Sequence, residues 1–92
     1  EMRRIKVKYR KLGKEKVHGL ADLGDNVIEI NERLYGKKFI EILLHESLHV
    51  LFPEAEENEI EKKSIILTNT VWHEGLRMID NENHLPLQDG SK

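Results

Sequence analysis

The chain has 92 residues, of which 35% are charged and only 5% are aromatic, with a net charge of −2. That length predicts one domain, residues 1–92, with a thin hydrophobic core, so a metal ion joining two elements would add to its stability. The absence of cysteine excludes disulfides and leaves His, Asp and Glu as ligands for a transition metal. No apolar stretch approaches the roughly 20 residues of a membrane span and no signal peptide is recognisable, so we expect a cytoplasmic protein without membrane contact.

The first third of the chain predicts a small antiparallel sheet of three strands. Ile5, Val7 and Tyr9 alternate with charged residues, which indicates a strand over residues 3–11. Residues 17–23 form a weaker second strand and residues 27–30 a third. The Gly-Asp-Asn turn sequence at residues 24–26 separates the last two strands, which predicts that they form a hairpin.

Two amphipathic helices are predicted after this sheet, which makes the fold class α+β. Apolar residues from Phe39 to Val50 recur at three- and four-residue spacings, and Pro53 follows, so we expect a helix over residues 38–51. A second helix begins near Ala55 and continues into the seventies, and residues 80–92 read as a polar tail. The inner stripe of this second helix is predicted to be Ile60, Ser64, Leu67 and Val71.

The basic segment at residues 3–16 contains eight Lys and Arg residues and one Glu. Lysines on an edge strand keep it solvated and oppose aggregation, which is the reading we favour, with a strip that binds phosphate or a partner as the alternative. Aromatic residues are not interleaved beyond Tyr9 and no nucleic-acid-binding motif is recognisable, which argues against a nucleic-acid partner.

The segment His45-Glu46-Ser47-Leu48-His49 matches the pattern H-E-x-x-H. Residues four apart lie on one face of a helix, so both imidazoles can reach one zinc ion. Glu46 is rotated by ~100° from His45, where it can activate a water as general base without being a ligand. The alternative is that both histidines are core residues satisfied by hydrogen bonds, because an unpaired imidazole in so apolar a stretch would be costly.

A zinc site of this kind needs a third protein ligand, and the sequence leaves its identity open. Glu57 and Glu61 lie on or beside the inner stripe of the second helix. Glu54 fits a solvated charge, and His73 fits a surface or supporting histidine better than a ligand.

With the motif in place, residues 5–75 resemble the small, phage-type members of the ImmA/IrrE-like zincin metallopeptidases. The resemblance rests on four segments of the sequence. These are the hairpin from Gly19-Leu20-Ala21 to Val27-Ile28-Glu29-Ile30-Asn31, the Ile42–Leu44 run before the motif, Leu48-His49-Val50-Leu51 closing it, and Glu57-Asn58-Glu59-Ile60-Glu61 opening the second helix.

This resemblance implies a minimal zincin-like hydrolase. Such an enzyme would be a zinc-dependent endopeptidase that hydrolyses a peptide bond in a protein substrate, such as a repressor, through a zinc-bound water activated by Glu46. In such zincins a glutamate of a downstream helix is the third ligand, often with a small residue three places on. Glu61 followed by Ser64 fits that shape, so the resemblance implies that the metal ligands are His45, His49 and Glu61, with Glu57 in reserve.

The resemblance also implies how a peptide would bind. An extended peptide would pair with an edge strand near the metal, for which we expect residues 27–30. Tyr35, His73 and Arg77 are candidate donors to the developing oxyanion. Because 92 residues leave little room for a substrate groove, the alternative function is a zinc-stabilised regulatory module of a mobile element that binds a protein without cleaving it.

Overall fold

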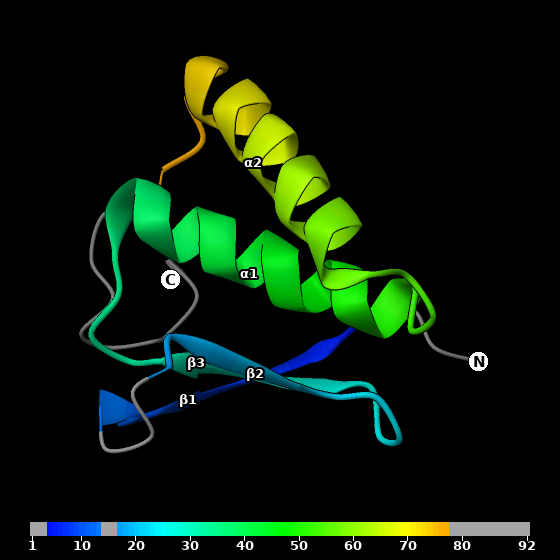
Figure 1. Cartoon of the computed structure of the whole chain (residues 1–92). Helices are drawn as coiled ribbons and strands as arrows, with labels where there is room; N and C mark the ends of the chain where they lie inside the picture. The colour runs from blue at the N-terminus through cyan, green and yellow to red at the C-terminus, as the bar shows by residue number, and fades with distance from the viewer. Residues whose placement is uncertain (1–3, 14–16, 78–92) are drawn as a thin grey trace.

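The computed structural model describes residues 4–13 and 17–77, which form a three-stranded sheet and two helices (Figure 1). The elements follow one another as expected from the sequence, which confirms the α+β class. The tail predicted at residues 80–92 lies outside the described residues. The elements are β1 (Lys6–Arg10), β2 (Gly19–Asp22), β3 (Val27–Asn31), α1 (Gly36–Leu51) and α2 (Glu57–His73).

The sheet has the strand order β1-β3-β2 and is mixed rather than antiparallel. The predicted hairpin is present, with β2 and β3 antiparallel and Ala21 opposite Ile28. However, β1 runs parallel to β3, with Val7 beside Ile28, so the antiparallel prediction is wrong for β1. Alternation in a sequence reports which side chains share a face but not the direction in which two strands pair, so β1 was the strand that the pattern left undetermined.

The expectation that residues 27–30 form an edge is also wrong, because β3 is the middle strand. Ile28 and Ile30 are completely buried, as expected for a strand with neighbours on both sides and a helix over one face. The two edges are β1, whose Lys6, Lys8 and Arg10 are exposed as predicted, and β2.

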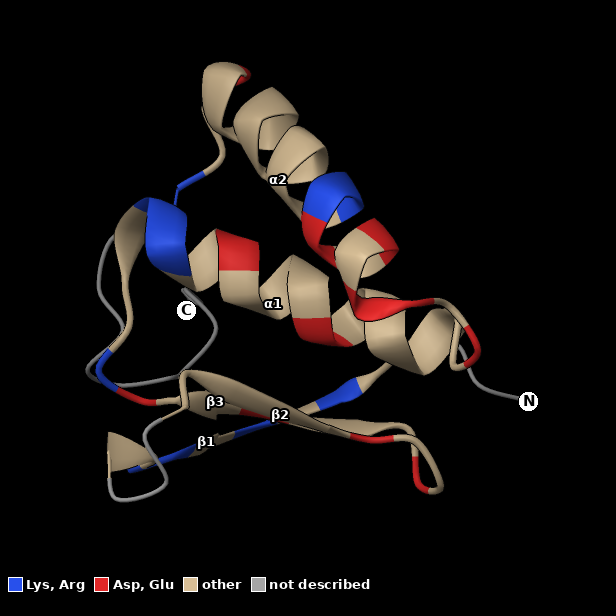
Figure 2. Ribbon diagram, in the orientation of Figure 1, with Lys and Arg blue, Asp and Glu red and all other residues tan. Residues whose placement is uncertain are grey.

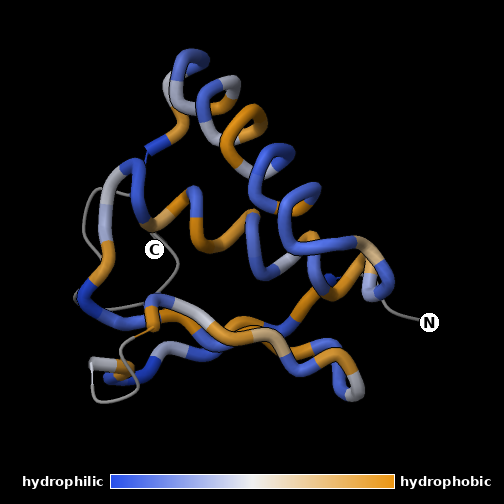
Figure 3. Tube along the Cα trace, in the orientation of Figure 1, coloured by the Kyte–Doolittle hydropathy of each residue, from blue (hydrophilic) through white to orange (hydrophobic). Residues whose placement is uncertain are grey.

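The molecule is built in three layers, with α1 lying across one face of the sheet and α2 packed against α1 (Figure 1). Figure 3 shows that hydrophobic residues run along the strands and recur on successive turns of α1. The core joins Ile28 and Ile30 of the sheet to Phe39, Ile40 and Val50 of α1. Within the described ranges, no helix has the length and apolar character needed to cross a membrane.

The inner face of α2 differs at one position from the predicted stripe. Ile60, Ser64 and Thr68 are buried, whereas Leu67 is 41% exposed. The buried residues are spaced by four, which is one of the side-chain rows along which helices pack. Ser64 and Thr68 are small, so they allow α2 to approach α1 closely. This close approach determines which side of α2 faces α1, and it leaves the apolar side chain of Leu67 partly exposed.

Charge is distributed unevenly over the fold. Figure 2 shows acidic residues around the start of α2, followed on the same helix by basic residues, and further basic residues along β1 and at the start of α1. Glu56, Glu57, Glu59 and Glu61 lie at the start of α2 and are followed by Lys62 and Lys63. The second half of α1 therefore lies beside an excess of carboxylates.

Candidate metal centre

His45 and His49 lie one turn apart on α1, and their ring centroids are 4.9 Å apart. The structure brings one carboxylate of α2 to both rings. The Nε2 atom of His45 lies 2.9 Å from Oε2 of Glu57, and the Nε2 atom of His49 lies 2.8 Å from Oε1 of the same residue. Two residues of α1 and the first residue of α2 therefore converge on one point.

The donor atoms of this cluster suit a zinc ion. One ligand atom from each of His45, His49 and Glu57 lies within 4.8 Å of the others. Two imidazole nitrogens and a carboxylate oxygen form a set that catalytic zinc sites use. Ligand atoms held tetrahedrally at zinc distances of ~2.0–2.1 Å would be ~3.3 Å apart. The two imidazole–carboxylate separations run to different oxygens of Glu57 and are a few tenths of an ångström shorter than that, so the side chains would need to adjust to place one atom each around a metal.

The geometry favours Glu57 over Glu61 as the third ligand. Glu61, which the resemblance implied, has its Oε1 atom 3.8 Å from Nδ1 of His45, the ring nitrogen that does not face Glu57. Glu57 opens α2 directly above the two histidines, whereas Glu61 is a full turn further along. Which glutamate meets the histidines depends on where α2 crosses α1, and the sequence contains no measure of that crossing.

Ser64 orients the ring of His45 from the other side. Its Oγ donates a hydrogen bond of 2.9 Å to the carbonyl oxygen of Glu61 and lies 3.5 Å from Nδ1 of His45. Because the hydroxyl proton is already used, Oγ can accept the Nδ1–H of the imidazole. A proton on Nδ1 leaves the lone pair on Nε2, the nitrogen that faces Glu57 and His49. Ser64 is thus placed, across a long contact of 3.5 Å, where it can favour the tautomer that a metal requires.

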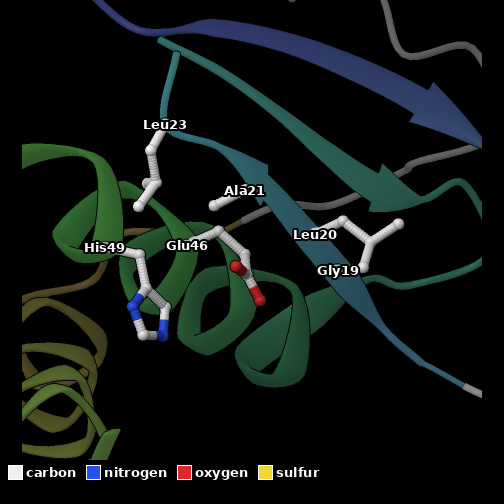
Figure 4. A pocket seen from close by; sticks show the side chains of 6 residues that line it. All are labelled: Gly19, Leu20, Ala21, Leu23, Glu46 and His49. Carbon is white, nitrogen blue, oxygen red and sulfur yellow. The ribbon is translucent and has the colours of Figure 1, made fainter. Parts of the chain in front are cut away.

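Glu46 lies beside this cluster and not within it. Its side chain and that of His49 line a groove between α1 and β2 with a volume of about 260 Å³, together with Gly19, Ala21 and other residues of the β2 segment (Figure 4). Burial raises the pKa of the Glu46 carboxyl above its ordinary value, and the two neighbouring histidines oppose that rise. A carboxylate that is partly removed from water and next to a group of candidate metal ligands is suitably placed for a general base.

The groove residues Gly19, Leu20, Ala21 and Leu23 were not predicted to belong to the site. The available signal was weak. It consisted of two small residues, Gly19 and Ala21, at alternate positions of a predicted strand. The contact of β2 with α1 explains this pair, because it shows that the two small residues face the helix that carries the motif.

The other candidates lie away from the cluster. His73 follows Glu57 by sixteen residues of α2, which is ~24 Å along the helix, and Tyr35 precedes α1, ~15 Å from His45. Arg77 donates a hydrogen bond of 2.6 Å to the carbonyl oxygen of Trp72 and lies over its ring. The structure therefore brings none of the three predicted oxyanion donors to His45, His49 and Glu57, and His73 lies too far along α2 to join these candidate ligands.

Comparison of the chain with protein-family models, with curated proteins and with solved structures finds no match. The resemblance to the ImmA/IrrE-like zincins therefore stays a prediction from the sequence. The function must be argued from the side chains that the fold brings together.

Proposed function

We propose that this protein is a zinc-dependent endopeptidase that hydrolyses a peptide bond in a protein substrate, in the cytoplasm. His45, His49 and Glu57 would hold the metal, and Glu46 would be the general base. One observation carries the proposal, namely that three suitable ligand side chains from two helices converge beside a half-buried carboxylate that faces a groove. Membership of the ImmA/IrrE-like zincins remains part of this proposal.

When bound, zinc supplies Lewis-acid polarisation of the reacting carbonyl and lowers the pKa of water. Glu46 accepts the proton of the attacking water and then passes it to the amine that leaves as the C–N bond breaks. The position of Glu46 against β2 keeps its carboxylate partly out of solvent, and this burial by itself raises its pKa, which favours proton acceptance. Glu57 and the two histidines serve as ligands and take no part in the proton transfer.

Among the described residues β2 has no strand partner on its outer edge, which provides a means of holding an extended peptide. The amide of Asn31 donates to the carbonyl of His18, and these two residues are opposite each other in the register of β2 and β3. In antiparallel pairs, residues whose main-chain groups bond across the pair alternate with residues whose groups point outwards. The main-chain groups of Leu20 therefore form hydrogen bonds to β3, while those of Gly19 and Ala21 point to the outer edge of the sheet. A substrate strand would pair there, next to Glu46.

The test of this proposal compares the wild-type protein with Glu46→Gln and His49→Ala. We expect about one zinc per chain in the wild type and in Glu46→Gln, and much less in His49→Ala, measured by elemental analysis. Cleavage of a casein or peptide-library probe should fall by at least about 100-fold in Glu46→Gln, because a neutral amide cannot accept the proton. Retention of cleavage by Glu46→Gln, or absence of metal from zinc-supplied wild type, would contradict the proposal.

A further inference from the structure

We propose that Gly19 is a positioning residue, whose missing side chain lets β2 lie against Glu46 and so fixes the direction of the Glu46 carboxylate. The catalytic part of this inference rests on the proposed peptidase function. The structural part does not, because it concerns a contact between β2 and α1 that exists whether or not the protein cleaves peptides.

The space at Gly19 is too small for any side chain. A Cβ atom there would lie 2.7 Å from Cγ2 of Ile42, 3.0 Å from Cγ of Glu46 and 3.2 Å from Oε2 of Glu46. Carbon atoms in van der Waals contact are separated by ~3.5–4.0 Å. Even alanine would therefore force β2, Ile42 or Glu46 to move.

The requirement for glycine at this position is spatial and not conformational. Among the described glycines, Gly36 and Gly75 have positive φ angles, and Gly19 does not. Its backbone is that of an ordinary strand, which alanine adopts easily. By contrast, a Cβ added at Gly13 would have no described atom within 4 Å, although the chemical change is the same.

The rigidity of Ile42 determines which group would move. Ile42 is β-branched, so its Cγ2 atom cannot swing away without leaving the preferred rotamer of a helix. Glu46 has an unbranched side chain that can rotate, and β2 is an edge strand that can shift away from α1. A side chain at position 19 would therefore displace the carboxylate, widen the groove beside it, or do both.

The three proposed metal ligands lie outside this close contact, although His49 lines the same groove. They come from α1 and α2, and none of them is among the nearest neighbours of a Cβ at position 19. Gly19→Ala should therefore alter the position of the base without altering the ligands. This separation distinguishes a positioning role from a general loss of structure.

The first experiment measures zinc content, kcat and KM for the wild type, Gly19→Ala and the matched control Gly13→Ala. We expect all three proteins to retain about one zinc per chain and the control to keep its activity. In Gly19→Ala we expect kcat to fall by at least about tenfold, since a misplacement of ~1 Å can cost a hundredfold. Loss of zinc together with activity in Gly19→Ala, or an unchanged kcat, would overturn the proposal.

The second experiment needs no cleavage at all. It is a double-mutant cycle of unfolding stability with Gly19→Ala, Glu46→Ala and the double variant, all loaded with zinc. Because Glu46→Ala removes the Cγ and carboxylate atoms that a Cβ at position 19 would meet, we expect the double variant to be more stable than the sum of the two single effects. The 2.7 Å contact with Cγ2 of Ile42 remains in the double variant, so only the destabilisation caused by Glu46 is relieved. If Gly19→Ala alone fails to fold, the whole cycle is measured in an Ile42→Ala background, which removes that contact. Additive effects would overturn the positioning role. Absence of cleavage in the wild type would overturn only the proposed function.

Discussion

Glu57 and Glu61 differ by one turn of α2, and that turn decides which nitrogen of His45 each carboxylate meets. Glu57 faces Nε2 of both histidines, whereas Glu61 lies towards Nδ1 of His45 together with Ser64. A carboxylate or hydroxyl on the non-ligating nitrogen of a histidine orients the ring and increases its basicity. Under the proposed function, Glu57 would be the ligand and Glu61 would support the ring of His45.

These roles predict different losses of zinc affinity. We expect Glu57→Ala to weaken zinc binding by more than about 100-fold, because a charged ligand is lost, and Glu61→Ala to weaken it by less, within the ~10–100-fold range of supporting residues. Competition with a chromophoric chelator measures both affinities under the same conditions. The reverse order would restore Glu61 as the ligand implied by the resemblance.

At the scale of elements, the position of β2 matters more to the site than that of any other strand. It is an edge of the sheet, it contacts α1, and its residues line the groove that contains Glu46. The alternation of hydrogen bonding places the N–H of Ala21 on the free side and that of Leu20 on the side of β3. A change that removes one outward N–H can therefore weaken substrate pairing while leaving the ladder within the sheet intact.

Ala21→Pro makes that change, because proline has no N–H and is tolerated on edge strands when the missing donor faces solvent. We expect KM for a peptide substrate to rise by about tenfold, the equivalent of one hydrogen bond of about 1.4 kcal/mol, with zinc content unchanged. Steady-state kinetics on a defined peptide measure this effect. Ala21→Gly, which keeps the N–H, is the control, and an equal rise of KM in both variants would show that peptides bind elsewhere.

For the whole molecule, the proposed zinc ion would join α2 to α1 at the end of the fold where the acidic residues gather (Figure 2). Several apolar side chains of the two helices remain exposed, among them Leu51 and Ile66, so helix packing does not bury all the available hydrophobic surface. In a chain of this length a bound metal is expected to add substantially to stability.

Removal of zinc with a chelator should therefore lower the melting temperature. With free zinc at 100 times Kd, binding adds about 2.7 kcal/mol, and at 4–8 °C per kcal/mol this corresponds to a shift of roughly 10–20 °C. Calorimetry or circular dichroism with and without chelator measures the shift. His49→Ala should show little dependence on zinc, and an equal shift in that variant would mean that the metal acts at another site.

The sequence by itself determined the elements and the local geometry of the motif. The periodicity of residues 38–51 predicted a helix, and within one helix a spacing of four places His45 and His49 on the same face with Glu46 beside them. The hairpin of β2 and β3 was equally predictable, because two short strands and their turn are adjacent in the chain. These features depend on residues only a few positions apart.

Only the tertiary structure decided the direction of β1, the central place of β3, the selection of Glu57, and the contact of Gly19 with Glu46. Each of these depends on how elements far apart in the chain pack, and side-chain periodicity contains no information on strand order or helix crossing. Glu57 and Glu61 looked equivalent as residues of one helix face. The crossing of α2 over α1 distinguishes them, because it brings only the first turn of α2 above both histidines.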